Sequence, residues 1–366
     1  MQKLMEIKKD ESILVSSKTE SFLKPDMIYL PISSRDTFLV KKNDSVKIGD
    51  KITEQIFSPV SGVVQGLMKM NSLDESVAYL EILNDFEERR VKNTGLKRKI
   101  TKENVLSVLN LAGKKSLVLN AIDDEIYVLT ENFYLFCYYE EFLELLDEIH
   151  QLFSLEHIYV CLKASSSENI NQLMSDLGMY PDIILKVVPD LYLLAKPQFL
   201  LSYLEIDEED SLVVSAHTFY HAYNFLKRGR TMSDIFITIS GNAVKNPMVV
   251  QVKLGSLLKD VINELVLYQE EDVTYIANGL LSGKEIDLDS FVVTPSLHSL
   301  LIMKREERKQ EEKCLNCGLC SEVCPVHLNP RLWKNPKYKE QMEKQCIKCG
   351  LCTYICPVYI RFLEER

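Results

Sequence analysis

The cysteines of this chain are concentrated in two matching motifs near its C-terminal end. Eight of the ten cysteines fall in the last 53 residues, and each motif has the spacing Cys-x2-Cys-x2-Cys-x3-Cys-Pro. The first motif contains Cys314, Cys317, Cys320 and Cys324, and the second contains Cys346, Cys349, Cys352 and Cys356. Thiolates at this spacing are the usual ligands of [4Fe–4S] clusters. The sequence therefore predicts two [4Fe–4S] clusters.

The fourth cysteine of each motif is expected to serve the cluster of the other motif. Three closely spaced thiolates hold one face of a cluster, whereas the cysteine ahead of proline turns toward the second cluster. This assigns Cys314, Cys317, Cys320 and Cys356 to cluster 1, and Cys346, Cys349, Cys352 and Cys324 to cluster 2. Crossed ligation forces the two halves to fold together, with the clusters close enough to exchange electrons.

Zinc and disulfide bonds are the alternatives for these cysteines. Structural zinc sites usually use two separated cysteine pairs, so three evenly spaced thiols and a fourth before proline suit a tetrahedral ion poorly. Disulfides need an oxidising compartment and are typical of small secreted domains. The complete match of both motifs favours iron–sulfur clusters. A purely structural role for the clusters is a further alternative, which reversible redox cycling would exclude.

Four residues outside the motifs could also bind a metal or react. Cys137 and Cys161 have apolar neighbours in the sequence and are predicted to be buried core thiols. His217 and His221 are four residues apart, so they share one face of a predicted helix. A metal site there would need a further ligand, which Thr218 does not offer. Both histidines are therefore predicted to be core or surface residues.

The composition indicates a globular protein with an acidic body and a basic C-terminal segment. The 366 residues provide room for two or three domains, and 46% of them are apolar. Residues 304–366 carry a net charge of +4, which leaves −14 for residues 1–303. The basic excess offsets the negative charge of the clusters and does not indicate nucleic-acid binding. No apolar run reaches the ~18 residues of a membrane span, and the first residues lack the apolar core of a signal peptide, which predicts a cytoplasmic protein.

Four segments with different patterns follow one another, and together they predict a multidomain α/β protein. Residues 27–86 contain short β-branched strands separated by turn residues, which predicts a carrier-like β-sandwich of the barrel-sandwich-hybrid type. Residues 95–230 alternate strands and helices, which predicts a doubly wound α/β domain with a mostly parallel sheet. Residues 231–303 are predicted to form a β-grasp, SLBB-like module. Residues 304–366 are predicted to form the dicluster ferredoxin-type domain.

The α/β segment places acidic residues where such sheets bind ligands. Strands are expected at 116–122, 157–164, 182–189 and 211–216, with helices at 131–153, 167–178 and 216–229. Parallel sheets bind ligands at the carboxyl ends of their strands. Asp123, Asp124 and Glu125 follow the first strand, and residues 216–220 follow the fourth. A cofactor of this domain would lie beside these two segments.

The order of these parts resembles the C subunit of the Rnf electron-transport complex and its soluble relatives, such as the electron-transfer protein associated with proline reductase. The resemblance extends from about Met27 to Arg366. It is carried by LVKKNDSVKIGDKI, SPVSGVV, ITISGNAVKNP, NGLLSG and the two cysteine motifs. Residues 120–127, NAIDDEIY, also resemble the family's Asn-Gly-Ala-Glu-Cys-Glu-Pro-Tyr segment.

The resemblance implies a flavin site, from which this sequence departs. The family passes hydride from NADH to FMN in the α/β domain and then single electrons through two clusters, and residues like Asp123 and Glu125 lie near its flavin and nicotinamide. Its phosphate loop is of the Gly-Gly-x-Gly-Phe-Pro type, whereas the equivalent segment 91–105 has one glycine, Gly95. Residues 215–218, SAHT, replace a usual Asn-Val pair. These departures predict that the FMN and NADH sites are degenerate.

The leading hypothesis is an iron–sulfur electron-transfer protein that relays single electrons through two [4Fe–4S] clusters between a donor and an acceptor. The remaining domains would act as a docking scaffold. The alternative is an NADH-dependent FMN/iron–sulfur oxidoreductase that keeps its flavin through altered contacts beside Asp123 and Glu125. The expected partners are redox proteins, either a membrane Rnf-like complex or a soluble reductase. No nucleic-acid partner and no direct membrane insertion are expected.

Overall fold

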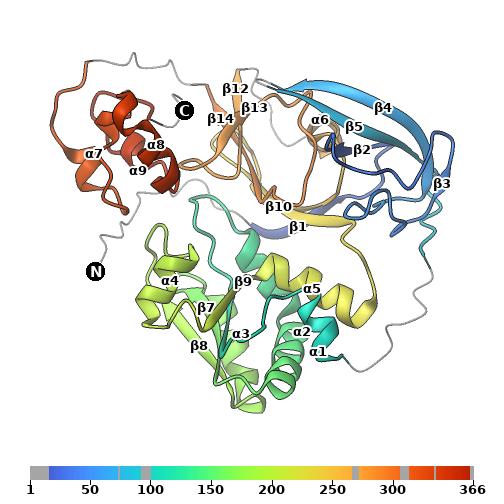
Figure 1. Cartoon of the computed structure of the whole chain (residues 1–366), viewed down its shortest axis with the longest axis horizontal. Coiled ribbons are helices and arrows are strands. Elements are labelled where there is room, and N and C mark those ends of the chain that lie inside the picture. Colours follow the sequence, from blue (N-terminus) through green and yellow to red (C-terminus); the bar gives the residue numbers. More distant parts are fainter. Residues whose placement is uncertain are drawn as a thin grey trace.

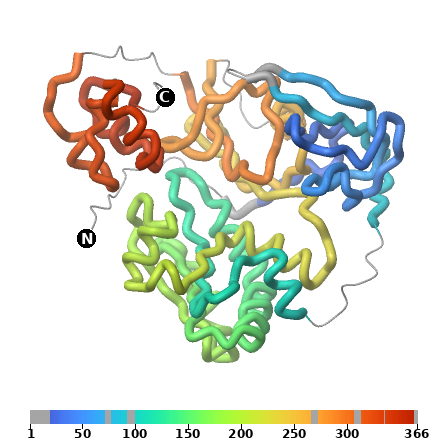
Figure 2. The backbone as a smooth tube through the Cα atoms, in the orientation of Figure 1, coloured from blue at the N-terminus to red at the C-terminus, as the bar shows by residue number. Residues whose placement is uncertain are grey.

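A computed structural model shows three β-sheets, a group of helices and a C-terminal cysteine-rich domain (Figure 1). It describes residues 16–72, 75–91, 100–265, 272–305, 313–333 and 335–362. Most of the segment that replaces the family's glycine loop, including Gly95, lies outside these residues. Figure 2 shows the cysteine-rich domain (residues 313–362) at one end of the molecule and residues 27–84 at the other, with most of residues 234–304 between them.

The N-terminal sheet is antiparallel and encloses a small aliphatic core. Its strands are β2 (Met27–Ile32), β3 (Ser45–Val46), β4 (Gly62–Ser72) and β5 (Glu75–Asn84), in the order β2-β5-β4-β3. The side chains of Ile28, Ile52 and Ile82 are fully buried in this core. Their burial removes apolar surface from water and holds the sheet against the loop between β3 and β4.

The central α/β domain contains a four-stranded parallel sheet in the order β8-β7-β6-β9. The strands are β6 (Ser116–Asn120), β7 (His157–Lys163), β8 (Ile183–Val188) and β9 (Ser211–Ser215). The helices are α1 (Lys102–Leu106), α2 (Thr130–Phe153), α3 (Ser167–Asp176), α4 (Pro197–Leu204) and α5 (Ala216–Arg228). The strands and helices predicted between 116 and 229 are confirmed, each within two residues at its ends.

Helices cover both faces of this sheet. Alternate residues of β6 divide between two cores: Leu117 and Leu119 face α2, α3 and α5, whereas Val118 faces α4. The chain leaves β6 for β7 on one side, and β9 pairs with β6 on the other side. The carboxyl ends of β6 and β9 therefore form a topological switch point, the position where open α/β sheets bind ligands.

A six-stranded sheet joins the other parts. Its strands are β1 (Ser16–Phe22), β10 (Asp234–Ser240), β11 (Met248–Lys253), β12 (Val273–Ala277), β13 (Lys284–Ile286) and β14 (Ser299–Lys304), in the order β1-β11-β10-β14-β12-β13. Helix α6 (Leu258–Leu265) covers it with Leu258, Val261 and Ile262. Its other face joins the core of the α/β domain through Phe236 and Val249.

The cysteine-rich domain consists of short helices and loops, drawn in red in Figure 1. The helices are α7 (Leu319–Glu322), α8 (Pro336–Gln345) and α9 (Leu351–Tyr354), with a 3-10 helix at Pro330–Leu332. None of the helices formed by the described residues is long and apolar enough to cross a membrane.

Candidate iron–sulfur and switch-point sites

The two cysteine motifs adopt the same backbone conformation, displaced by 32 residues. Asn316 and Lys348 both have positive φ, at 54° and 56°. Gly318 and Gly350 follow at 84° and 78°, and each is the N-cap of a four-residue helix that carries the third cysteine of its motif. Positive φ at these positions lets the backbone between the cysteines turn tightly. The sequence repeat is therefore also a repeat of local structure.

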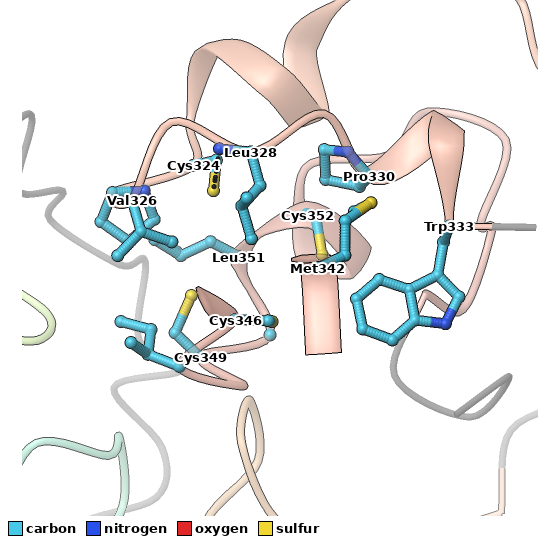
Figure 3. Close-up of a pocket in the computed structure, with 13 residues that line it drawn as sticks. Cys324, Val326, Leu328, Pro330, Trp333, Met342, Cys346, Cys349, Leu351 and Cys352 are labelled. Atoms are coloured by element: carbon cyan, nitrogen blue, oxygen red, sulfur yellow. Dashed lines mark hydrogen bonds between the residues drawn. The ribbon is translucent and has the colours of Figure 1, made fainter. Parts of the chain in front are cut away.

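Each of two cavities in this domain is lined by four cysteines taken from both motifs. One cavity has Cys314, Cys317, Cys320 and Cys356 in its wall. The other has Cys324, Cys346, Cys349 and Cys352, with apolar residues such as Leu328 and Leu351 between them. Figure 3 shows Cys324 and Cys349 on opposite sides of this second cavity. Each cavity thus brings together the four cysteines that crossed ligation would assign to one cluster.

The donor chemistry of both cavities fits an iron–sulfur cluster. All ten cysteines are free thiols. Backbone amides donate to the sulfurs from Asn316 N to Cys314 Sγ at 3.4 Å, from Lys348 N to Cys346 Sγ at 3.4 Å, and from Leu328 N to Cys324 Sγ at 3.2 Å. Burial raises the pKa of the Cys349 thiol to about 11, and bound iron would offset this cost of forming the thiolate.

The two cavities differ in their exposure. In the first cavity Cys314 and Cys317 are exposed and Cys320 is buried, whereas in the second Cys349 and Cys352 are both buried. The loop around Cys349 packs with Leu351 against Ile126 and Tyr192 of the α/β domain. The first cavity therefore faces solvent, and the second faces the body of the protein.

Glu125 connects the second cavity to the α/β domain. Its carboxylate accepts hydrogen bonds from Leu281 N at 2.9 Å, Ser282 N at 2.9 Å and Ser282 Oγ at 2.6 Å. The Tyr192 hydroxyl lies 3.1 Å from Glu125 Oε1 and 2.6 Å from the carbonyl oxygen of Cys349. The hydroxyl can donate its one proton to either oxygen, so Tyr192 lies between Glu125 and the Cys349 loop and holds the cysteine-rich domain against the sheets.

Comparison with known proteins supports this interpretation of the cysteines. A family model described as a 4Fe-4S dicluster domain matches residues 306–358. The C subunit of the proton-translocating ferredoxin:NAD(+) oxidoreductase complex of Clostridium ljungdahlii is 33% identical over 109 residues, which are 29% of this chain and 24% of that protein. The C subunit of the ion-translocating oxidoreductase complex of Haemophilus influenzae is 21% identical over 352 residues, which cover 83% of this chain and 43% of that protein.

The chain is similar to the C subunits of these ion-translocating oxidoreductase complexes. It spans between about a quarter and a half of the length of the curated relatives it matches. Among solved structures, an NAD+-reducing [NiFe]-hydrogenase in the H2-reduced state overlaps with 62% of this chain and 51% of the hydrogenase chain. The TM-score of that overlap is 0.45 and the identity is 10%, which is too distant to inform on function.

The chain has a second candidate site at the switch point, a cavity of about 400 Å³. Asn120 and Ser215 line it from the ends of β6 and β9, and His298 lines it from the segment before β14. Four carboxylates also line it, those of Asp123, Asp124, Glu125 and Glu131. Lys196 is the one lysine among the described residues of the wall. This switch-point cavity is therefore acidic.

Both acidic residues predicted beside a flavin lie in this wall, but both are used in holding the fold. Asp123 accepts hydrogen bonds from Glu131 N at 2.8 Å and Asn132 N at 3.0 Å, so it caps the start of α2. Burial raises its pKa, and the helix amides act in the opposite direction. Glu125 makes the contacts to Leu281 and Ser282 described above. These hydrogen bonds account for the positions of both carboxylates without a bound ligand.

The described wall does not fit the phosphate of FMN. A phosphate is usually held by glycine backbone amides or a helix N-terminus. None of the described residues that line the cavity is a glycine, and its acidic side chains would repel the dianion. The same lining favours a cation.

Two histidines and a glutamate meet at one side of the cavity, which the sequence did not predict. One ligand atom each from Glu131, His217 and His298 lies within 4.8 Å of the other two. Burial, together with the neighbouring His221 and His298, lowers the pKa of His217 to about 3, so its imidazole is neutral at pH 7. Burial raises the pKa of Glu131 to about 8. The residues come from three separate segments, so no local spacing pattern could have revealed the group.

The remaining cysteine and histidine predictions have mixed outcomes. Cys161 is buried in β7, as predicted, and its pKa is raised by burial to about 12. Cys137 was predicted to be buried and is exposed. Successive residues of a helix point about 100° apart, so the apolar neighbours of Cys137 in the sequence do not share its face. His217 is a buried residue, in agreement with its prediction.

Proposed function

We propose that this chain relays single electrons between protein redox partners through two [4Fe–4S] clusters. The ligands would be Cys314, Cys317, Cys320 and Cys356 for cluster 1, and Cys346, Cys349, Cys352 and Cys324 for cluster 2. The observation that carries the proposal is the pair of four-cysteine cavities within one folded domain. Clusters of this type supply reversible one-electron exchange when they are bound.

The unequal burial of the two cavities supports a relay with an inner and an outer end. At the outer end, beside Cys314 and Cys317, the side chains of Leu315 and Leu319 are 63% and 38% exposed. Exposed apolar side chains beside a redox site suit a transient protein partner. At the inner end, Tyr192 holds the Cys349 loop against the α/β domain. A second partner would therefore act from the side of the body.

The other parts are proposed to serve as a docking scaffold. These are a barrel-sandwich-hybrid-like domain at 27–86, an α/β domain at 95–230 and a β-grasp module at 231–303, followed by the dicluster domain at 304–366. The relatives' names describe ion-translocating complexes, so the partner is either an Rnf-like complex or a soluble reductase. The chain is proposed to be cytoplasmic and to reach a membrane only through that partner.

The alternative function, an NADH-dependent FMN reductase, receives less support. The switch-point cavity would have to hold FMN, and its described wall is acidic and lacks glycine. Asp123 and Glu125 are also committed to hydrogen bonds within the fold. A role for Asp123 or Glu125 beside a flavin is therefore proposed only for the alternative function, the FMN reductase.

Counting iron and flavin together tests the proposal. Protein purified without oxygen and supplied with iron, sulfide and FMN should contain about eight irons and no flavin per chain. Its cluster absorbance should bleach with dithionite, recover on reoxidation, and stay unchanged with NADH alone. One tightly held FMN together with bleaching by NADH would establish the reductase instead. Absorbance that does not cycle reversibly would indicate structural clusters.

The chain offers a matched control for this count. Cys320→Ser removes a proposed ligand and should lower the iron to about four per chain. Cys137→Ser makes the same chemical change at an exposed cysteine outside the motifs and should leave the iron unchanged. Equal iron in both variants would contradict the ligand assignment.

A further inference from the structure

The fold brings together three side chains that the proposed relay does not use, those of Glu131, His217 and His298. Glu131 lies in the first turn of α2, His217 lies in the first turn of α5, and His298 precedes β14. Their ligand atoms lie within 4.8 Å of one another. Imidazole nitrogens and a carboxylate oxygen in one place form a donor set for divalent transition metals.

The backbone and side chains around the group hold each member in position. One oxygen of Glu131, Oε2, accepts a hydrogen bond from His217 N at 2.9 Å. His298 N donates to Asn278 Oδ1 at 2.8 Å, and the carbonyl oxygen of His298 accepts from Thr130 Oγ1 at 2.7 Å. These bonds hold the Glu131 carboxylate and the backbone of both histidines beside one another.

Some polar atoms of this group have no hydrogen-bond partner within it. Nε2 of His217 is buried and has no hydrogen-bond partner among the described residues. Glu131 Oε1 lies 3.9 Å from His298 Nδ1, which is too long for a hydrogen bond. Buried polar groups normally have a partner, so this arrangement is incomplete without a ligand. A cation would complete it.

The surroundings favour a cation and provide access to it. Glu131 and His298 line the switch-point cavity, together with three further carboxylates. The side chain of His298 is 41% exposed, whereas that of Glu131 is 14% exposed. An ion held here would have protein on one side and the cavity on the other.

We propose that Glu131, His217 and His298 bind one divalent transition-metal ion through two imidazole nitrogens and one carboxylate oxygen, with open coordination positions facing the switch-point cavity. Nitrogen ligands exclude magnesium and calcium, which prefer oxygen. Zinc and ferrous iron both accept two histidines and one carboxylate, and zinc binds such sites more tightly. Zinc is therefore the probe. The proposal does not depend on the relay function.

The test uses the full chain after its iron–sulfur clusters have been reconstituted without oxygen, so that the motif cysteines are occupied. The protein is equilibrated with ~10 µM Zn2+, passed through a desalting column and analysed for zinc and iron. Wild-type protein should retain about one zinc per chain in addition to its iron. X-ray absorption at the zinc edge should show nitrogen and oxygen neighbours at ~2.0–2.1 Å.

Variants separate this site from other zinc binding. His298→Ala and Glu131→Gln should each weaken zinc binding at least about tenfold without changing the iron content. The glutamine keeps an oxygen that can accept from His217 N. His221→Gln is the control, because this histidine lies one turn along α5 and outside the group; its zinc should equal that of wild type. The proposal is overturned by absence of zinc from wild-type protein, by equal zinc in His298→Ala, or by sulfur neighbours at ~2.3 Å.

Discussion

The cysteine-rich domain and the switch-point cavity are two sites built by opposite means. The cysteines that line the first lie within 43 residues, between Cys314 and Cys356, and the two halves repeat one backbone conformation. The residues that line the second come from positions between Asn120 and Ser299, on strands and loops that are far apart in the sequence. A site made by local spacing can be recognised in the sequence, whereas a site made by folding appears only when the elements are assembled.

Paired cysteine substitutions test whether ligation is crossed, and their effect on the iron content should be the largest of the predicted effects. If ligation is crossed, Cys324→Ser combined with Cys349→Ser damages one cluster and should leave about four irons per chain. Cys324→Ser combined with Cys317→Ser damages both clusters and should leave almost none. Iron analysis after anaerobic reconstitution measures this. The reverse pattern would mean that each motif holds its own cluster.

The two equivalent glycines of the repeat should differ in their tolerance of alanine. A Cβ at Gly350 would lie 1.9 Å from the carbonyl oxygen of Leu281, whereas a Cβ at Gly318 would meet nothing within 4 Å. Both have positive φ, which costs an alanine about 1–2 kcal/mol. Gly350→Ala should lower the free energy of unfolding by roughly 2 kcal/mol more than Gly318→Ala does, because the loop must move away from Leu281. Anaerobic thermal unfolding measures the difference, and equal losses would show that the cysteine-rich domain is not fixed there.

The acidity of the switch-point cavity should appear in the pH dependence of stability. Burial raises the pKa of Asp124 to about 6 from 3.8, so the folded state binds this proton more tightly than the unfolded state. Stability is therefore lost as pH rises from about 4 to 6. Asp124→Asn removes this cost and should be more stable by about 1–2 kcal/mol at pH 7.5, after allowance for solvent screening. The gain should shrink toward pH 5; a gain that does not vary with pH would contradict the assignment.

Tyr192 should show a smaller effect, confined to the inner cavity. Tyr192→Phe removes the hydroxyl that lies between Glu125 and the Cys349 carbonyl, which should cost about 1 kcal/mol of stability. Redox titration should show a shift in one of two cluster potentials only, because Tyr192 packs beside the inner cavity and not in the wall of the outer one. Tyr203→Phe is the control, since Tyr203 is 47% exposed and its change should alter neither property. Equal shifts of both potentials would argue against an inner and an outer cavity.

The same contrast explains which features of the molecule could be predicted from the sequence. The strands β6 to β9 were located because buried parallel strands form continuous apolar runs. The cysteine groupings followed from spacing alone. By contrast, Glu131 and His298 lie 86 and 81 residues from His217, and nothing in the sequence links them. Strand β1 leaves only a weak signal in the sequence, since SSKTESF contains few apolar residues and pairs through its backbone. Cys137 was placed wrongly because sequence neighbours in a helix need not share its exposure.

The pairing of β1 with β11 has a consequence for how the protein is made. Phe22 pairs with Val252, so the strand at the beginning of the described chain must wait for a partner that is synthesised 230 residues later. At 5–20 residues per second, that delay is on the order of ten to fifty seconds on the ribosome. The parallel sheet at 116–215 can form during the delay, because all four of its strands have already emerged. A nascent chain arrested before residue 248 should therefore expose β1 as an unpaired strand, whose backbone donors and acceptors are open to pairing with another chain.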